Sequence, residues 1–350
     1  MKPLRIVLTS DFHFSANPNI SDQIIPLMRY GKEVLGVFLK QMQDMQIDLF
    51  ILCGDHTVSG KKQDRETFQK ELFKIKESGI PILMTTGNHD FDLCSIEEYQ
   101  DTYLPLLACT NQDPSSLSYS YVKDNIRFLA MDDSSQKKIG FSEETMQWLE
   151  HELIQSENQT VIFLSHHNLF LNAWHKNPLQ YQIQNKDLIP LLHKYGVKLA
   201  ITAHQHVPYI QTQDSLTEIV LPAPLASPFQ YGYLEIGDDL HYEVRNLDLQ
   251  KYNPLLYWAS IQKVNNCHEL RKTGFLKFFE KRYDETTAIQ MTDSLQTWFD
   301  AYEKGTLSSF QTDPLFLHTL HELHASGYEE YILYLLKHHE TSVRILTDTL

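Results

Sequence analysis

Residues that could bind a metal ion recur at five places in this 350-residue sequence. Each place combines aspartate, asparagine or histidine directly after a short apolar run. The five groups are Ser10-Asp11-Phe12-His13, Gly54-Asp55, Gly87-Asn88-His89-Asp90, Ser165-His166-His167 and Ala203-His204-Gln205-His206. One such group is common by chance, but five that each follow a strand-like run indicate a metal site.

The apolar runs that precede these groups are typical of buried strands. They are short, rich in β-branched residues and bounded by turn or polar residues. The runs span residues 4–9, 47–53, 80–85, 161–164 and 197–202. In an open α/β sheet, residues just beyond the carboxyl ends of neighbouring strands meet at one edge, where ligands bind. We therefore expect the five groups to converge.

Spacing within two of the groups favours shared ligation. Side chains at positions i and i+2 of an extended segment point to the same face, so Asp11 and His13 can reach one ion, as can His204 and His206. The ligand atoms are oxygen and imidazole nitrogen without thiolate, which suits Mn, Fe, Zn or Ni. Seven ligands are too many for one tetrahedral ion, so the pattern predicts two ions that share a carboxylate.

In order and content, the groups resemble the signature of the calcineurin-like metallophosphoesterases, over roughly the first two thirds of the chain. The resemblance implies two divalent ions, Mn, Fe or Zn, with Fe³⁺ an option for one of them. It implies that Asp55 bridges the ions, that Asn88 and His89 face the substrate, and that His89 stabilises or protonates the leaving oxygen while Asp90 fixes its imidazole. The other ligands would be Asp11, His13 and His206 at one ion, and Asn88, His166 and His204 at the second.

Phosphoester hydrolysis is the chemistry that such a site performs. A hydroxide held between two divalent ions about 3.5–4 Å apart is a nucleophile at neutral pH, and the ions neutralise charge on the phosphoryl oxygens. Asn88 is a weaker, neutral ligand, which leaves its ion freer to accept a phosphate oxygen. The sequence shows neither a Ser/His/Asp triad nor a phosphate-binding Gly-rich loop, and the paired ions make both unnecessary.

Two positions depart from the common family pattern. Val58 stands where an acidic residue is frequent, and Ala203 replaces a glycine. The Ala203 methyl is tolerable unless the backbone there is left-handed.

For His56 and His167 we favour a structural role, because a lone buried histidine is more often hydrogen-bonded than ligating, but a contribution of either to the site stays open. We expect His167, directly after His166, to point the other way.

Composition limits the partners. The net charge is −15, and the Lys and Arg residues are scattered, which argues against a nucleic-acid polymer and for a small anionic phosphoester. Four cysteines without framework spacing predict no disulfide scaffold. The start of the chain lacks a signal-like segment, and no apolar run has the length of a membrane span. We therefore expect a cytoplasmic protein that does not associate with membranes.

Chain organisation changes near residue 250. Before it, strand-like runs alternate with helix-like ones such as residues 142–153 and 186–195. The family resemblance implies an α/β fold for residues 1–250, a four-layer αββα sandwich of two mixed sheets. Residues 251–350 predict a C-terminal α-helical domain with helices over residues 255–264, 269–282, 288–302, 315–324 and 329–337. The roles open to it are covering a sheet, forming a homo-oligomer or narrowing the active site.

Three classes of function compete. The blocks look most like those of the bacterial class III cyclic-nucleotide phosphodiesterases, so the leading hypothesis is a metal-dependent hydrolase of a small phosphodiester, a cyclic nucleotide. A phosphomonoesterase or nucleotide pyrophosphatase would use the same site. A non-catalytic scaffold would typically lose ligands, and all are retained here. A nuclease of the same superfamily would need a basic groove, and the sequence gives no sign of one.

Overall fold

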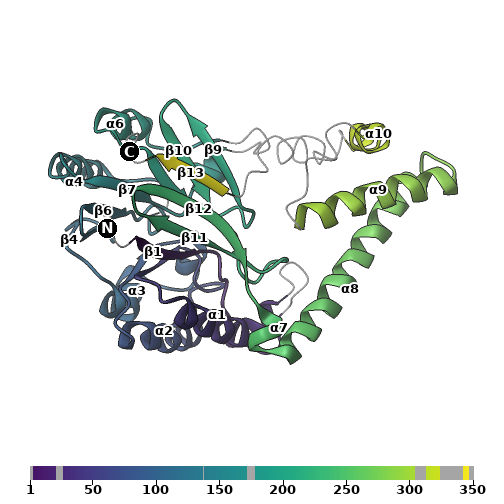
Figure 1. Cartoon of the computed structure of the whole chain (residues 1–350), viewed down its shortest axis with the longest axis horizontal. Helices are drawn as coiled ribbons and strands as arrows, with labels where there is room; N and C mark the ends of the chain where they lie inside the picture. The colour runs from purple at the N-terminus through teal and green to yellow at the C-terminus, as the bar shows by residue number, and fades with distance from the viewer. Residues whose placement is uncertain are drawn as a thin grey trace.

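Two β-sheets packed face to face form the centre of the molecule, with helices on both outer faces (Figure 1). The computed structural model describes residues 3–20, 27–136, 138–171, 178–303, 313–323 and 342–346. The predicted αββα sandwich is therefore confirmed.

The first sheet has six strands in the order β13-β12-β11-β1-β2-β3. They are β1 (Leu4–Thr9), β2 (Leu49–Cys53), β3 (Ile82–Thr85), β11 (Gln230–Ile236), β12 (Asp239–Asn246) and β13 (Ser342–Leu346). Strands β1, β2 and β3 are parallel to one another, so their carboxyl ends share one edge. The other neighbours pair antiparallel.

The second sheet has seven strands in the order β4-β5-β6-β7-β8-β10-β9. They are β4 (Asn111–Gln112), β5 (Tyr119–Lys123), β6 (Ile126–Ala130), β7 (Thr160–Leu164), β8 (Leu199–Thr202), β9 (Tyr209–Gln213) and β10 (Leu216–Val220). Strands β6, β7, β8 and β10 run parallel, and this places the ends of β7 and β8 at one edge of the sheet.

Side-chain alternation along the strands explains the layers. In β2, Leu49 and Ile51 enter the core between the sheets, whereas Phe50 and Leu52 enter the core under the helices. In β7, Ile162 likewise faces the other sheet and Phe163 the outer helices. Successive strand residues point to opposite faces, so a strand that is apolar at every position must be covered on both sides.

Helices cover the two outer faces. The first sheet carries α1 (Gly31–Met45), α2 (Lys62–Glu77) and α3 (Ile96–Tyr103), and the second carries α4 (Glu143–Ile154) and α6 (Leu188–Lys194). Short helical turns complete this part: η1 (Met28–Tyr30), η2 (Asn88–Phe91), η3 (Leu104–Leu106) and α5 (Pro178–Tyr181). Ser142 caps the N-terminus of α4, since its hydroxyl accepts from the Thr145 N–H at 3.1 Å.

The C-terminal region is helical but not purely so. It contains α7 (Leu249–Tyr252), α8 (Pro254–Phe279), α9 (Glu285–Glu303) and α10 (Pro314–Glu322), and α8 extends away from the sandwich whereas α9 runs back toward it (Figure 1). One prediction was wrong. The helices expected at 255–264 and 269–282 form the single helix α8, because no proline or glycine interrupts residues 264–269. Residues 342–346 form β13, which pairs with β12 and returns to the first sheet. The helix expected at 329–337 lies outside the described residues.

All four cysteines are free. Within the described residues, no helix has the length and apolar character needed to cross a membrane.

Candidate metal centre

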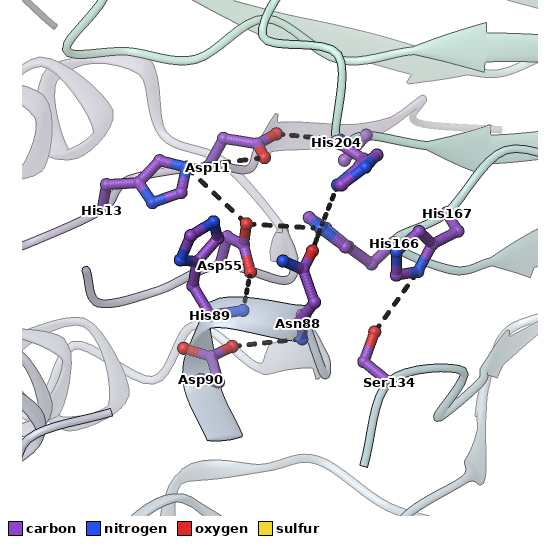
Figure 2. Close-up of polar contacts among 12 residues, drawn as sticks. Asp11, His13, Asp55, Asn88, His89, Asp90, Ser134, His166, His167 and His204 are labelled. Atoms are coloured by element: carbon purple, nitrogen blue, oxygen red, sulfur yellow. Dashed lines mark hydrogen bonds and ion pairs between the residues drawn. The ribbon is translucent and has the colours of Figure 1, made fainter. Parts of the chain in front are cut away.

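The five groups converge at the carboxyl edge shared by the central strands (Figure 2). Loops after β1, β2 and β3 carry ligands from the first sheet, and loops after β7 and β8 carry ligands from the second. We refer to Asp11, His13 and His206 as the first group, and to Asn88, His166 and His204 as the second group. The site therefore lies where the two sheets meet.

Backbone conformation sets these loops apart from the rest of the described chain. Nine described non-glycine residues have positive φ, and five of them are Asp11, His13, Asp55, His204 and His206. Such conformations cost on the order of 1–3 kcal/mol each and persist where function requires a side chain to be aimed. Ala203 is not among them, so its methyl meets no left-handed backbone.

In the first group, imidazoles face a buried carboxylate. The Nε2 atoms of His13 and His206 lie 2.9 Å apart. Asp11 Oδ1 lies 3.4 Å from His206 Nε2 and 4.0 Å from His13 Nε2. Asp11 also accepts the main-chain N–H of His204 at 3.1 Å through Oδ2. These distances bring one carboxylate and two imidazoles to one point.

The second group is equally compact. His166 Nε2 lies 3.1 Å from Asn88 Oδ1 and 3.1 Å from His204 Nδ1. His166 is fully buried, whereas Asn88 and His204 are partly exposed. An amide oxygen and two imidazole nitrogens therefore face one another on the open side of the site.

Asp55 lies between the groups, as Figure 2 shows. Its Oδ2 is 3.6 Å from His13 Nε2 and 3.4 Å from His166 Nε2. Its Oδ1 accepts the main-chain N–H of His89 at 2.8 Å. One oxygen thus faces both groups while the other is held by the backbone.

Neighbouring carbonyls orient two of the imidazoles. His166 Nδ1 lies 2.9 Å from the Cys53 carbonyl, and His204 Nε2 lies 3.1 Å from the Gln180 carbonyl. A carbonyl can only accept, so these nitrogens carry the hydrogen. The opposite nitrogen of each ring then faces the centre, which is how proteins usually orient histidine ligands.

The pKa values of His13, Asp55 and His166 show how strongly these buried side chains interact. Burial lowers the pKa of His13 to about 4, and the Asp55 carboxylate opposes this shift only in part. The His13 imidazole is therefore neutral. Burial also acts on Asp55 and His166, but their mutual attraction outweighs it, holding the pKa of Asp55 well below its usual range and raising that of His166 to about 10. A metal ion would compete with the proton on His166.

The donor set fits metal ions. Asp11 Oδ1 is buried without a hydrogen-bond partner, although a buried carboxylate oxygen normally has one. The facing Nε2 atoms of His13 and His206 likewise converge beside it. A cation would satisfy these lone pairs together, and the set contains only oxygen and nitrogen, as Mn, Fe and Zn accept.

The side chains of His89 and Asp90 lie in different surroundings. The His89 imidazole is half-exposed, with Nδ1 3.2 Å from the Val58 carbonyl and 3.3 Å from Asp92 Oδ2. Its ring lies 4.9 Å from that of His13. The Asp90 carboxylate instead accepts main-chain N–H groups, of His56 at 3.0 Å, Thr57 at 3.2 Å and Gly87 at 3.1 Å. The expectation that Asp90 fixes the His89 imidazole was wrong, because the tight turn at Gly87 directs that carboxylate to the backbone.

The two histidines left open lie in different surroundings. His56 is buried, and its Nε2 lies 3.0 Å from the Thr85 carbonyl and 3.1 Å from the Tyr99 hydroxyl. His167 does not point away. Its Nδ1 is 3.2 Å from the buried Asp133 Oδ1, and its ring lies 4.4 Å from that of His204. With His166 and His204 it offers ligand atoms within 4.8 Å of one another, so these three residues together could hold a metal ion.

A pocket of about 720 Å³ opens over the centre. Asp55, Asn88, His89, His167, His204 and His206 form its floor, and Lys138, Ile139, Leu179, Gln180, Tyr181 and Gln184 form its wall. This volume is in the range of small-molecule sites. The wall combines one cation with amide, aromatic and aliphatic groups, so it can contact both an anion and an uncharged substituent.

Sequence reasoning missed the residues behind the ligands. Asp133 accepts the main-chain N–H groups of His166 at 3.1 Å and His167 at 2.8 Å, and it follows a strand just as the ligands do. That position could have indicated its role. The Cys53 and Gln180 carbonyls gave no signal, since any residue supplies a carbonyl.

Gly87 provides a test of the site's geometry. A Cβ at this position would lie 2.0 Å from the Asp55 main-chain nitrogen and 2.4 Å from Asp55 Oδ1. We expect Gly87→Ala to displace Asp55 and to weaken metal binding by at least about 10–100-fold, the usual effect of disturbing the support of a ligand. Calorimetric titration with Mn²⁺ measures this.

Gly36→Ala is the matched control. Its Cβ meets nothing within 4 Å in α1. We expect it to keep metal binding and to stabilise the helix by up to about 1 kcal/mol. Wild-type affinity in Gly87→Ala would contradict the described contact between the two loops.

Comparison with known proteins agrees with this geometry. Residues 4–208 match the family described as calcineurin-like phosphoesterase. A probable glycerophosphodiester phosphodiesterase GpdQ of Arcobacter nitrofigilis is 31% identical over 198 residues, which cover 55% of this chain and 67% of the relative. A probable cyclic nucleotide phosphodiesterase of Synechococcus is 21% identical over 267 residues, 75% of this chain and 95% of the relative.

A solved structure shares the fold. A dimetal phosphatase from Danio rerio superposes with a TM-score of 0.57 at 14% identity, covering 69% of this chain and 96% of that protein. The family predicted from the five groups is thus confirmed over more than half of the chain. The chain belongs to the calcineurin-like phosphoesterase family and is a hydrolase that acts on phosphoester bonds.

Proposed function

We propose that this protein hydrolyses small phosphodiesters with two divalent ions, one held by each group and both by Asp55. The observation that carries the proposal is the position of Asp55 Oδ2, which lies 3.6 Å from His13 Nε2 and 3.4 Å from His166 Nε2. A single oxygen in reach of both groups is what a shared ligand requires. Asp11, His13 and His206 would complete the first position, and Asn88, His166 and His204 the second.

The bound ions would supply a nucleophile at neutral pH and neutralise charge on the phosphoryl oxygens. The chain's own side chains divide the remaining tasks. The His89 imidazole lines the pocket beside the first group, where it can donate a proton to the leaving oxygen. Its main-chain N–H holds Asp55, so the same residue aligns the shared carboxylate and the reacting phosphate.

Among phosphodiesters we favour a cyclic nucleotide. The wall of the pocket offers the Tyr181 ring and the aliphatic Ile139 and Leu179 for a base, and the Gln184 amide for hydrogen bonding. The exposed Lys138 lies at the same wall and suits an anion. Similarity to a relative named as a probable cyclic nucleotide phosphodiesterase supports this choice. A glycerophosphodiester is the alternative, favoured by the relative of 31% identity.

A substrate panel tests the proposal. The Mn²⁺-loaded protein is assayed with bis(p-nitrophenyl) phosphate, 3′,5′-cyclic AMP, glycerophosphocholine and p-nitrophenyl phosphate. We expect hydrolysis of the synthetic diester and of the cyclic nucleotide, with lower kcat/KM for the monoester. Cleavage of glycerophosphocholine alone among the natural diesters would replace the cyclic nucleotide by the alternative. No cleavage of any diester would overturn the function itself.

Removal of metal gives a second result. We expect a chelator to abolish turnover and added Mn²⁺ to restore it, because the proposed nucleophile depends on the ions. The catalytic rate is measured before chelation, after dialysis and after titration. Turnover that persists in protein shown by elemental analysis to be metal-free would contradict the two-ion proposal.

A further inference from the structure

A fully buried carboxylate lies behind the second group. Glu218 in β10 has no exposed surface, and its partners among the described residues include no Lys or Arg. Oε1 accepts the main-chain N–H of Leu169 at 2.7 Å and the hydroxyl of Thr202 at 2.8 Å. Oε2 accepts the main-chain N–H of Phe170 at 3.2 Å and the amide of Gln211 at 2.7 Å. A charge this deep is costly unless hydrogen bonds compensate it, and four donors do so here.

Two of those donors lie in the segment that follows His166 and His167. Leu169 and Phe170 are outside any strand of the sheet, so the sheet's own hydrogen bonds do not hold them. Glu218 supplies the acceptors that the backbone needs as it turns away from β7. The carboxylate therefore fixes the path of the loop that carries His166.

The second loop of the group is joined to the same carboxylate. Thr202, which donates to Glu218, also accepts the Asn168 amide at 2.9 Å. That amide contacts the Ala203 carbonyl at 3.3 Å, directly before His204. Asn168 Oδ1 accepts the Gln205 amide at 2.8 Å, directly after His204. His204 is thus enclosed on both sides by one network that ends on Glu218.

The network also reaches the wall of the pocket. The Asn168 N–H donates to the Tyr181 carbonyl at 3.1 Å, and the Asn168 carbonyl accepts from Ile183 at 3.0 Å. The Gln182 amide donates to the Leu169 carbonyl at 2.7 Å. One buried side chain is therefore connected to both histidine loops and to the segment that presents Tyr181 and Gln184.

We propose that Glu218 is a positioning residue that sets the geometry of His166 and His204, and with it the affinity of the second metal position. The proposal rests on the proposed function, because it assumes that the second group binds an ion. A residue needed only for the sheet would have partners within the sheet. Glu218 has two such partners, Thr202 and Gln211, but each of its oxygens also accepts a main-chain N–H of the loop that follows His166 and His167. Partners of this kind typically change metal affinity by about 10–100-fold.

Glu218→Gln is the informative substitution because it keeps the shape. Whichever way the new amide turns, its NH₂ group faces the N–H of Leu169 or the N–H of Phe170. One of these main-chain donors then loses its acceptor, and the loop must shift. Two-site calorimetric titration with Mn²⁺ or Co²⁺ should show about 10–100-fold weaker binding at one position and unchanged binding at the other.

Glu152→Gln is the matched control. Glu152 is also a buried carboxylate, but it pairs with Arg127 and with the Asn111 amide, and none of these residues lines the pocket. We expect this variant to lower the melting temperature and to keep both metal affinities. A loss of affinity in both variants would show a general effect of stability and would overturn the positioning role.

Thr202→Val provides a second test of the same network in case Glu218→Gln does not fold. It removes the hydroxyl that joins Glu218 to Asn168 and stays close in shape, and it should weaken the same metal position. Wild-type protein that binds no metal would reject the proposed function. Wild-type protein that binds two ions, together with variants that bind both equally well, would reject the role of Glu218 alone. Failure of both variants to fold would show that the network is structural and would also reject that role.

Discussion

Replacing His89 with alanine should leave both metal ions bound and lower turnover by about 10²–10⁴-fold, the usual effect of removing a positioned proton donor. The imidazole and the main chain of this residue have different partners. Its imidazole contacts the Val58 carbonyl and Asp92 at the pocket, whereas its main-chain N–H holds Asp55. Alanine keeps the N–H and loses only the imidazole. The measurements are kcat on a phosphodiester and metal content by elemental analysis.

Two variants complete this experiment. His241→Ala removes a half-exposed histidine of β12 outside the pocket and should change neither quantity. Asp92→Asn removes the charge beside His89 Nδ1 and should reduce turnover less than His89→Ala, because the Val58 carbonyl remains. Loss of metal in His89→Ala would instead make this imidazole a ligand, as its place beside His13 and Asp55 allows.

Asp55→Asn should lose metal as well as activity. The carboxylate is 1% exposed, and Oδ2 faces both groups. A neutral amide removes the charge that offsets two cations and can turn its NH₂ toward the imidazoles. We expect affinity to fall by more than about 100-fold, since loss of a partner behind a ligand already costs about 10–100-fold. Metal titration and turnover are measured together.

Asp113→Asn is the control for this substitution. Asp113 is also 1% exposed and accepts from Ser115 and Ser116, but it does not line the pocket. It should affect stability without changing the number of bound ions. Two ions bound with wild-type affinity to Asp55→Asn would show that Asp55 is not the shared ligand.

The sheets could be predicted well because their strands are apolar at nearly every position. The run over residues 4–9 matches β1, and the run over residues 161–164 differs from β7 by a single residue. Helix boundaries in the C-terminal region were harder, because Asn265 and Asn266 are residues that can end or start a helix, yet both lie inside α8. The pairing of β13 with β12 could not be predicted, because a short strand far along the chain gives no local sign of its partner.

Single side chains were the least predictable part. Asp90 and Asp92 are two residues apart, and only the turn at Gly87 decides that the first reaches the backbone of His56 and Thr57 while the second lies beside His89. His167 was expected to face away from His166 as it would on a strand. The loop that Asp133 holds is not extended, so both rings stay in the site.

The sequence by itself determined which residue types meet and at which edge of the sheets. Strands that are apolar on both faces must be covered on both sides, and parallel strands bring their carboxyl ends together. The tertiary structure decided the rest. It placed Asp55 between the first and second groups. The Cys53 and Gln180 carbonyls determine which nitrogen of His166 and of His204 faces the centre. Glu218 lies behind the loops that carry these two histidines. These choices depend on contacts between segments that are not neighbours in the sequence, from the 24-residue separation of Gln180 and His204 to the 113-residue separation of Cys53 and His166, and the local sequence does not encode such contacts.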